Sequence, residues 1–402
     1  MEKKRTPRLR FRGFTDDWEQ RKLLGCIEKI TDFRGRTPKK LGMDWSENGY
    51  LALSALNVKD GYIDFSRDVH YGDQDLYDKW MSGNELHKGQ VLFTTEAPMG
   101  NVAQVPDTSK YILSQRTIAF DVKAELITED FLATVLRTPK VFSDLTSLST
   151  GGTAKGVSQK TLAFVNILIP RDLAEQDRLS SFFKSLDGLI TLHQRKLESI
   201  KLLKKSLLQK MFPKSGETVP EVRFPGFTDA WEQRKLDKIA NRYDNLRIPV
   251  TASDRISGTT PYYGANGIQD YVKGFTHDGE FVLIAEDGAN DLHNYPVQYV
   301  NGKVWVNNHA HVLQGINGLV DTRFLGYAFS QVNMEAILVG GSRAKLNASD
   351  LMKIEIRLPR LMQEQQHIAT FLHSLDQTIT LHQRKVEALQ KLKKSLLQQM
   401  FV

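Results

Sequence analysis

The chain has 402 residues, of which 41% are hydrophobic and 25% are charged, and this is the composition of a globular protein large enough for two or three domains. The net charge of +7 favours polyanionic partners such as nucleic acid. The single cysteine, Cys26, excludes an intrachain disulfide. Since no stretch approaches the ~20 apolar residues of a membrane span and the first residues lack a signal-peptide core, we expect a cytoplasmic protein without membrane contact.

Two segments of the chain occur twice, in the same order. FTDDWEQRKL at 14–23 returns as FTDAWEQRKL at 227–236 with nine of ten positions identical, and residues 185–212 return as 374–401 with 20 of 28 identical. This order predicts two halves related by a pseudo-two-fold axis, which suits a two-fold partner such as duplex DNA. Since the short segment is constant, Trp18 and Trp231 could pack against the ends of the long segments or against a partner subunit, but we expect plain core packing.

The blocks between the repeats, 24–184 and 237–373, share little sequence. Both are rich in Gly, Asn, Asp, Tyr and β-branched residues, and their apolar runs at 89–95 and 279–288 are closed by turn residues. Such runs predict strands in mixed α+β domains. The repeated segments at 14–23, 185–212, 227–236 and 374–401 form a constant part of the chain, here called the frame. The two blocks that differ, here called the heads, are the variable parts that would read a partner.

The long repeats predict two helices of about 40 residues, each about 60 Å long at ~1.5 Å per residue. Pro170, Pro213 and Pro359 lie at their expected limits. The pseudo-two-fold axis predicts that the helices pack antiparallel. Apolar residues at steps of three and four predict the seam between them: Leu179, Phe182, Leu186, Leu189, Ile200, Leu203 and Leu207 with Ile368, Phe371, Leu375, Leu389, Leu392 and Leu396. The middle of this seam is polar, with His193, Lys196, Thr378, His382 and Lys385, and we expect His193 to approach His382 and to fix the register.

Several motifs resemble one known family. The long segments begin with AEQ (174–176) and QEQ (363–365) and carry LHQRK and KKSLLQ; the second block has YYGANGIQDYV (262–272), LIAEDG (283–288) and VNNHAHVL (306–313). The first block has GQVLFTTEAPMGNVAQV (89–105) and ILSQRTIAFDV (112–122), and the blocks close with the glycine turns GGTAKG (151–156) and GGSRAKL (340–346). The chain resembles, over its whole length, the specificity subunit of type I restriction-modification enzymes. The first turn departs from the second in lacking an arginine like Arg343 and in having Thr153 where the second has Ser342.

The resemblance implies an α+β fold with two mixed α/β target recognition domains, at 1–172 and 215–361. Two long helices, at 173–214 and 362–402, would separate them as an antiparallel coiled coil with a pseudo-two-fold repeat. It also implies a non-catalytic subunit that reads a bipartite double-stranded DNA target, one domain per half-site. Two modification subunits would methylate adenine with S-adenosylmethionine, and restriction subunits would use ATP and Mg²⁺, so no cofactor is expected in this chain.

Candidate DNA-contacting residues follow from the chemistry of base edges and phosphates. Arg reads guanine, Asn and Gln read adenine, and Lys, Arg and glycine loops hold phosphate. In the first block the candidates are Arg34, Arg36, Lys39, Thr94, Thr95, Met99, Asn101, Gln115, Arg116, Gly152, Thr153 and Lys155. In the second they are Tyr262, Tyr263, Ala265, Asn266, Asn307, Asn308, His309, Ser342, Arg343 and Lys345. The alternative is that they are ordinary turn and surface residues; the two glycine turns suit phosphate or structure, not base recognition.

Other functions have weaker patterns. Pro106-Asp107 with Asp121-Val122-Lys123 matches the permissive PD…(D/E)xK pattern of magnesium-dependent nucleases. His309-x-His311 could offer two imidazoles to zinc, and the long helices alone would suit a scaffold protein without a DNA role. The chain lacks both the Asn/Asp-Pro-Pro-Tyr/Phe motif of adenine methyltransferases and a P-loop.

Overall fold

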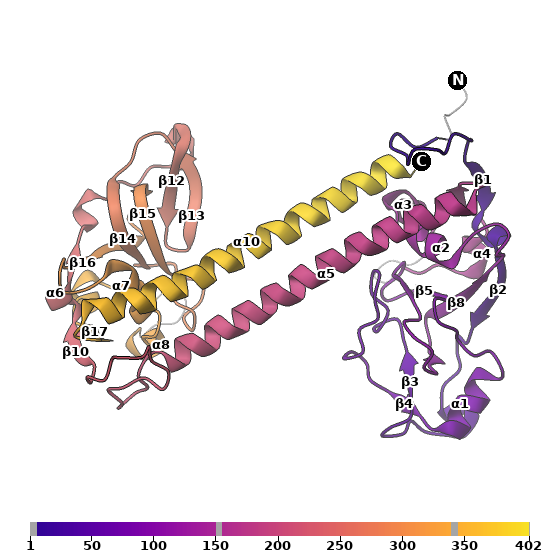
Figure 1. Ribbon diagram of the computed structural model, residues 1–402, viewed down its shortest axis with the longest axis horizontal. Coiled ribbons are helices and arrows are strands. Elements are labelled where there is room, and N and C mark those ends of the chain that lie inside the picture. Colours follow the sequence, from indigo (N-terminus) through magenta and orange to yellow (C-terminus); the bar gives the residue numbers. More distant parts are fainter. Residues whose placement is uncertain (1–5, 150–154, 339–344, 402) are drawn as a thin grey trace. The chain divides into compact units, whose positions relative to one another are not determined.

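The computed structural model describes residues 6–149, 155–338 and 345–401, and the chain divides into two units (Figure 1). Unit 1 comprises Met1–Gln194 and Arg384–Val402, and unit 2 comprises Arg195–Gln383. The division passes through both long helices, so each unit contains a head and a segment of each helix. The predicted boundaries between heads and helices stay a prediction. Among the described helices, none has the length and apolar character that a membrane crossing requires.

Unit 1 contains two sheets and a separate strand pair. The order of the larger sheet is β2-β8-β5-β6, antiparallel throughout, and in β4-β3-β7 the pair β3–β7 is parallel. The strand pair is β1 with β9. The strands are β1 Glu19–Lys22, β2 Ile27–Asp32, β3 Tyr50–Leu53, β4 Tyr71–Gly72, β5 Val91–Thr94, β6 Val102–Gln104, β7 Ile112–Leu113, β8 Thr117–Val122 and β9 Asn166–Ile169. The helices are η1 Leu23–Cys26, η2 Lys39–Leu41, α1 Gln74–Met81, α2 Glu129–Leu136, α3 Pro139–Leu148 and α4 Gln159–Leu162.

Unit 2 is built around one six-stranded sheet with the order β11-β16-β14-β15-β12-β13. Its separate strand pair is β10 with β17. The strands are β10 Glu232–Lys235, β11 Ala240–Arg242, β12 Ser257–Gly264, β13 Gly267–Val272, β14 His277–Ala285, β15 Val297–Val306, β16 Ala310–Gly315 and β17 Glu355–Leu358. The helices are η3 Asp244–Leu246, η4 Ala252–Asp254, α6 Leu236–Ile239, α7 Thr322–Phe329, α8 Met334–Ile337 and α9 Ala348–Leu351.

The strand predictions are confirmed. The run at 89–95 contains β5, all four residues of which are buried, and the run at 279–288 contains most of β14, whose last five residues are buried. Local capping sets the helices beside them, because the side chains of Thr128 and Asp321 accept the N–H groups of Phe131 and Phe324 at the starts of α2 and α7.

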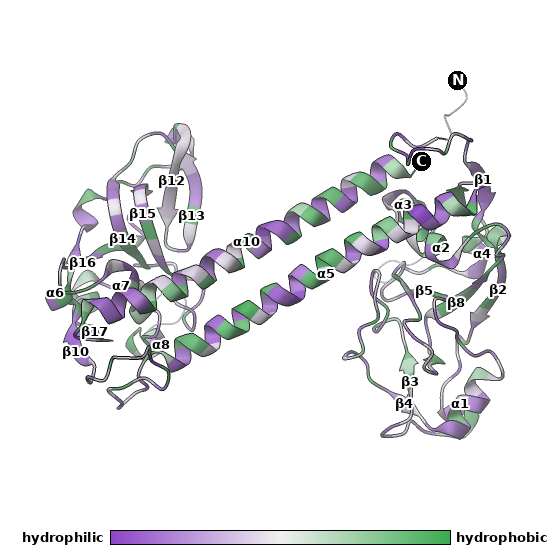
Figure 2. Ribbon diagram, viewed as in Figure 1, coloured by the Kyte–Doolittle hydropathy of each residue, from purple (hydrophilic) through white to green (hydrophobic). Residues whose placement is uncertain are grey.

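The long helices are α5 Leu173–Lys210, with 38 residues, and α10 Met362–Met400, with 39. Figure 2 shows apolar and polar residues alternating along both, as the periodicity predicted. In unit 1, Asp187 of α5 pairs with Lys393 of α10 at 2.6 Å, and in unit 2, Lys204 pairs with Asp376 at 2.5 Å. In unit 1, Phe183 also lies beside Phe401, so the partner position moves back along the chain as α5 moves forward, and the two helices run antiparallel.

At several positions of the predicted seam, the buried residue is the one that follows the predicted residue. Phe182 and Leu189 are 36% and 40% exposed, whereas their neighbours Phe183 and Ile190 are buried. The same shift makes Lys196 and Lys385 exposed beside the buried Leu197 and Val386, and the predicted seam residues Leu203 and Leu392 are 49% and 48% exposed. The physical reason is that positions i+3 and i+4 of a helix both lie near the next turn, and Phe183 is the one that packs, with its ring 5.7 Å from Phe401. The expected approach of His193 to His382 joins the two units and stays a prediction.

The repeated frame contains a buried ion pair in each unit. Arg10 donates to both carboxylate oxygens of Glu175 at 2.6 and 2.7 Å, and the Trp18 indole N–H lies 3.4 Å from the same carboxylate. In unit 2, Arg223 donates to Glu364 at 2.7 and 2.8 Å. Trp231 repeats the indole contact at 3.3 Å.

The glutamine after each glutamate ties the start of the long helix to the head. Gln176 donates to the carbonyls of Pro170 and Leu126, both at 2.9 Å, and accepts the Thr128 N–H at 3.0 Å. Gln365 makes the equivalent bonds to Pro359 and Leu319, and it accepts the Asp321 N–H at 2.9 Å. Both glutamines are fully buried, so the AEQ and QEQ motifs join each long helix to the head that precedes it.

The end of each long helix completes a core. Phe401 lies 5.8 Å from Trp18 and 5.9 Å from Phe131 in unit 1. Phe212, just after α5, lies 5.7 Å from Trp231 in unit 2. The predicted core packing of both tryptophans is confirmed, and the residues at the helix ends take part in it.

Candidate functional site

In unit 2 the structure brings three predicted segments together beyond the end of β14. Asn266, in the β12–β13 turn, donates to the Gly288 carbonyl at 2.8 Å and accepts the Asn290 N–H at 3.1 Å. His309, in the turn between β15 and β16, lies 2.5 Å from Asp287 through Nδ1. Lys345 pairs with Glu286 at 3.0 Å. The segment 286–290 therefore connects the hairpin turn, the strand-end turn and the exit of the second glycine turn.

Several of the predicted DNA-contacting residues in these three segments are buried and support the fold of the turns. Tyr262 is 1% exposed, and its hydroxyl bonds to the backbone of Val250. Ala265 and Asn307 are also buried, and the Asn307 N–H donates to the Tyr263 carbonyl at 3.0 Å. Burial raises the pKa of Tyr263. The predicted residues whose side chains reach solvent are Asn266, Asn308, His309 and Lys345.

A buried charge network anchors the exit of the second glycine turn. The Leu346 N–H donates to the Glu286 carbonyl at 2.7 Å, and His311 Nε2 lies 2.7 Å from the Leu346 carbonyl. A carbonyl only accepts, so His311 Nε2 carries a proton. The other ring nitrogen, Nδ1, lies 2.7 Å from Asp244. Arg247 donates to Glu286 at 2.6 Å and closes the network.

The network holds its carboxylates ionised. Burial alone would raise the pKa of Asp244, but hydrogen bonds from His311, the Val312 N–H and Arg242 outweigh it and lower the pKa to about 2. The pKa of Glu286 is lowered as well, because hydrogen bonds from Arg247 and Lys345 outweigh its burial.

Within the described ranges, one group of acidic and histidine side chains has the geometry of a metal site: Asp244, Glu286 and His311, with ligand atoms within 4.8 Å of one another. Arg247, Arg242 and Lys345 already supply positive charge to these oxygens. The group does not include His309, the other histidine of the zinc hypothesis. It includes neither Asp107 nor Asp121 of the nuclease pattern. Asp107 bonds to Ser109 and Tyr111, whereas Asp121 bonds to Gln90.

In unit 1 the predicted loop after β5 is held by its own side chains. Thr94 and Thr95 are buried, and the Thr94 hydroxyl accepts the Asn101 N–H at 2.9 Å. Asn101 donates to the Val58 carbonyl at 2.9 Å, and Met99 packs against the core. These side chains shape the loop.

In each unit the residues that follow the glycine turn bond to the end of a central strand, β5 in unit 1 and β14 in unit 2. Gly156 forms a bridge with Glu96, and the Val157 N–H donates to the Thr95 carbonyl at 2.9 Å. The bond from Leu346 to Glu286 is the counterpart in unit 2. Lys155 and Lys345, one residue before each exit, are exposed. Gly152, Thr153, Ser342 and Arg343 of the predicted turns lie outside the described residues.

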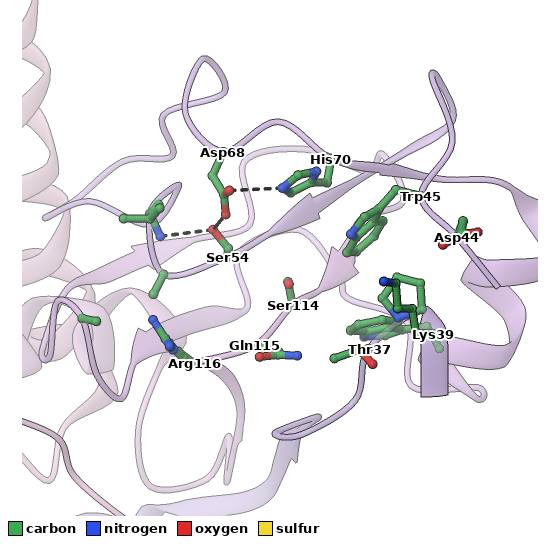
Figure 3. A pocket seen from close by; sticks show the side chains of 15 residues that line it. Thr37, Lys39, Asp44, Trp45, Ser54, Asp68, His70, Ser114, Gln115 and Arg116 are labelled. Atoms are coloured by element: carbon green, nitrogen blue, oxygen red, sulfur yellow. Dashed lines mark hydrogen bonds and ion pairs between the residues drawn. The ribbon is translucent and has the colours of Figure 1, made fainter. Parts of the chain in front are cut away.

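The basic residues of the 34–39 loop differ in their surroundings. Arg34 pairs with Asp32 at 2.7 Å. The Arg36 guanidinium donates to the Trp80 carbonyl and lies 4.4 Å over the Phe33 ring. Lys39 is exposed and lines a cavity with Gln115 and Arg116 (Figure 3).

This cavity, of about 410 Å³, is formed by segments from 37 to 116 in unit 1. Trp45, His70 and Trp80 form an aromatic wall, with Trp45 stacked on His70 at 5.3 Å and 5.6 Å from Trp80. Ser54 donates to Asp68 at 2.5 Å, and Asp68 lies 3.2 Å from His70. Since the carboxylate stands between the hydroxyl and the imidazole, the histidine is not placed to take a proton from the serine, and the arrangement is not that of a catalytic triad.

Sequence reasoning missed the ion pairs, the charge network and the aromatic wall. A signal existed for the ion pairs, because Arg10 and Arg223 both stand four residues before the duplicated segments at 14–23 and 227–236. No local pattern marked the charge network, since Asp244, Glu286 and His311 are far apart in the sequence.

Comparison with known proteins identifies the family. The model of the type I restriction modification DNA specificity domain matches residues 15–202 and 228–391, which together are well over half of the chain. The chain is a member of this specificity-subunit family. The two matches correspond to the two repeats, and the family agrees with the observed mixed α/β heads and long helices.

Relatives and a solved structure agree with this assignment. A type I restriction enzyme specificity subunit of Haemophilus influenzae is 47% identical over 148 residues, 37% of this chain and 38% of that protein. The MjaVIII specificity subunit of Methanocaldococcus jannaschii is 21% identical over 95% of this chain and 91% of its own length. The crystal structure of an S subunit from M. genitalium has the same fold, with a TM-score of 0.71, 14% identity and 99% coverage of both chains.

Proposed function

We infer that this chain reads a bipartite target in double-stranded DNA, one head per half-site, and docks modification and restriction subunits. The observation that carries the proposal is that the frame repeats while the heads differ. The Arg–Glu–Trp contact and the hydrogen bonds of the buried glutamine recur in both units. The sheets differ, because unit 1 has a four-stranded and a three-stranded sheet, whereas unit 2 has one six-stranded sheet. Two different heads that are attached to the long helices by the same contacts suit a target with two unlike half-sites.

The exposed groups near the strand ends supply the DNA contacts of this proposal. In unit 2 these are Asn266, Asn308, His309 and Lys345, and in unit 1 Lys39, Lys155 and Arg116 are exposed. Amide and arginine side chains suit base edges, and the lysines beside the glycine turns suit phosphates. The net charge of +7 supports binding to a polyanion.

The long helices carry apolar side chains that no core covers. Leu192, Leu202 and Leu381 are 61%, 67% and 63% exposed. Exposed leucines at this density support docking of protein partners. We assign the methyl transfer from S-adenosylmethionine to the modification subunits and the use of ATP and Mg²⁺ to the restriction subunits, and we propose a non-catalytic role for this chain.

Mapping of methylated adenines tests the proposal. A host that expresses this chain with its modification subunits should gain methylation at a split motif, and the same host without this chain should gain none. Exchange of residues 24–171 for another such block should change one half of the motif, and exchange of residues 237–358 should change the other. A contiguous motif, or a block exchange that alters both halves, would contradict the assignment.

A further inference from the structure

We propose that the cavity of unit 1 receives one nucleotide of the DNA target, with its base unstacked from the duplex and its phosphate at the mouth. The proposal rests on the DNA-reading function above and adds a mode of reading to it. The volume of about 410 Å³ falls within the roughly 300–1,000 Å³ of small-molecule sites. The groups that line the cavity are those that a nucleotide would need.

The aromatic wall is the first of these groups. His70 stacks on Trp45 at an interplanar angle of 17°, and its side chain is 48% exposed. Trp80, behind Trp45, is held in place by its indole N–H, which donates to the Leu113 carbonyl at 2.8 Å. A stack of aromatic rings backed by a fixed indole favours an unstacked base, since contact between a base and aromatic side chains is worth about 1–3 kcal/mol in single-strand binding.

The polar lining selects the kind of base. Asp68 already accepts from Ser54, but an ionised carboxylate has about four acceptor positions, so it can also accept from an exocyclic amine. Ser114 is almost buried and faces the cavity in Figure 3. Gln115 donates to the Arg36 carbonyl at 2.6 Å, which fixes the orientation of its amide. Adenine, cytosine and guanine carry an exocyclic amine and thymine does not, so we expect one of the first three.

The cavity lining carries two exposed cations, Lys39 and Arg116, and an exposed carboxylate, Asp44. Arg116 is exposed, and its guanidinium lies 3.2 Å from the Glu96 carboxylate, about half of which is also exposed. Lys39 lies at the other side of the lining in Figure 3. A surface ion pair of this kind is weak and exchanges readily for a phosphate, so both cations suit the backbone of the inserted nucleotide.

The backbone around the cavity adopts a conformation that is uncommon for residues with a side chain. In the described part of the chain, four non-glycine residues have positive φ, and three of them line this cavity: Asp68 at 46°, Ala97 at 47° and Arg116 at 66°. Such residues cost of order 1 kcal/mol or more each and concentrate at ligand sites, where surrounding contacts hold them. Their clustering supports a binding role for the cavity rather than an accidental gap.

A mismatch series tests the inference. The chain is assembled with its modification subunits, and duplexes carry the mapped motif with each base of the unit 1 half-site retained and its partner replaced. Unpairing a base that must leave the stack lowers the cost of insertion, so at one position outside the methylated adenine we expect binding about tenfold tighter. At positions read in the groove, a mismatch weakens binding by about 5- to 150-fold.

Two variants assign the effect to the cavity. Trp45→Ala should abolish the tightening, and His70→Ala should reduce it. Phe164→Ala, at a 65% exposed position elsewhere in unit 1, should leave it unchanged. Unaltered mismatch responses in the other half-site serve as the check that each variant is folded. Tightening that survives in Trp45→Ala would place the base in a modification subunit and overturn the proposal.

The remaining outcomes separate the two proposals. A split motif in which every mismatch of the unit 1 half-site weakens binding would refute the cavity proposal and leave the DNA-reading function intact. The absence of a split motif would refute both. Free deoxynucleoside monophosphates at millimolar concentration should not displace the DNA. Displacement would make free nucleotide the ligand and refute insertion from DNA.

Discussion

Replacing Glu364 by glutamine tests the buried ion pair that joins the entry segment of unit 2 to α10. The carboxylate is 2% exposed and accepts two hydrogen bonds from Arg223, whose side chain is 12% exposed. Glutamine keeps the shape, but it removes the charge and turns one acceptor into a donor that faces the guanidinium. Breaking a buried pair from one side costs about 3–5 kcal/mol. Since Arg223 also donates to the Asp229 carbonyl at 2.8 Å, we expect the lower end, about 3 kcal/mol.

The assay is thermal and urea unfolding of the chain. At about 2–4 °C per kcal/mol, the transition of unit 2 should fall by about 6–12 °C. Glu217→Gln, at an exposed position of the same unit, should change the free energy of unfolding by less than about 0.5 kcal/mol. Glu175→Gln should lower the transition of unit 1 instead. If Glu364→Gln cost under about 1 kcal/mol, the ion pair would not hold the frame as described.

Two further predictions concern the site in unit 2. The folded pKa of Asp244 is about 2 against 3.8 for the free side chain. Its contribution of about 2 kcal/mol to the free energy of unfolding is therefore present above pH ~4 and is lost as pH falls towards ~2. Asp244→Asn should flatten the dependence of the unfolding free energy on pH in that window, and an unchanged slope would contradict the assignment. Lys345→Ala should weaken DNA binding equally for all sequences and reduce the salt slope by about 1; Lys353→Ala, at another exposed lysine of the unit, should do neither, and equal effects of the two would exclude a specific phosphate contact.

The sequence predicted the frame well because the frame depends on local periodicity and on duplication. The two long helices, the strands at 91–94 and 281–285, and the packing of both tryptophans follow from patterns within a few residues. The prediction of the seam was wrong where two adjacent residues were both apolar. Phe182 and Phe183 fit the same periodicity, and only the position of Phe401, far along the chain, decides which one is buried.

The candidate site was harder to predict because one residue type serves two purposes. Asparagine, threonine and arginine read bases, but they also satisfy buried backbone groups, as Asn101 and Arg36 do. The sequence cannot distinguish these roles without the partner of each side chain. The cavity and the charge network consist of residues brought together by sheet topology, so no spacing in the sequence announces them.

The position of Leu397, Met400 and Phe401 in the core of unit 1 has a consequence for biosynthesis. Unit 2 is one continuous segment, Arg195–Gln383, and every residue of it leaves the ribosome before these three. The core of the head that is translated first therefore lacks these three side chains, and Trp18 lacks its contact with Phe401, until about two hundred further residues have been added. All residues of the core of unit 2 are therefore translated before the core of unit 1 is complete.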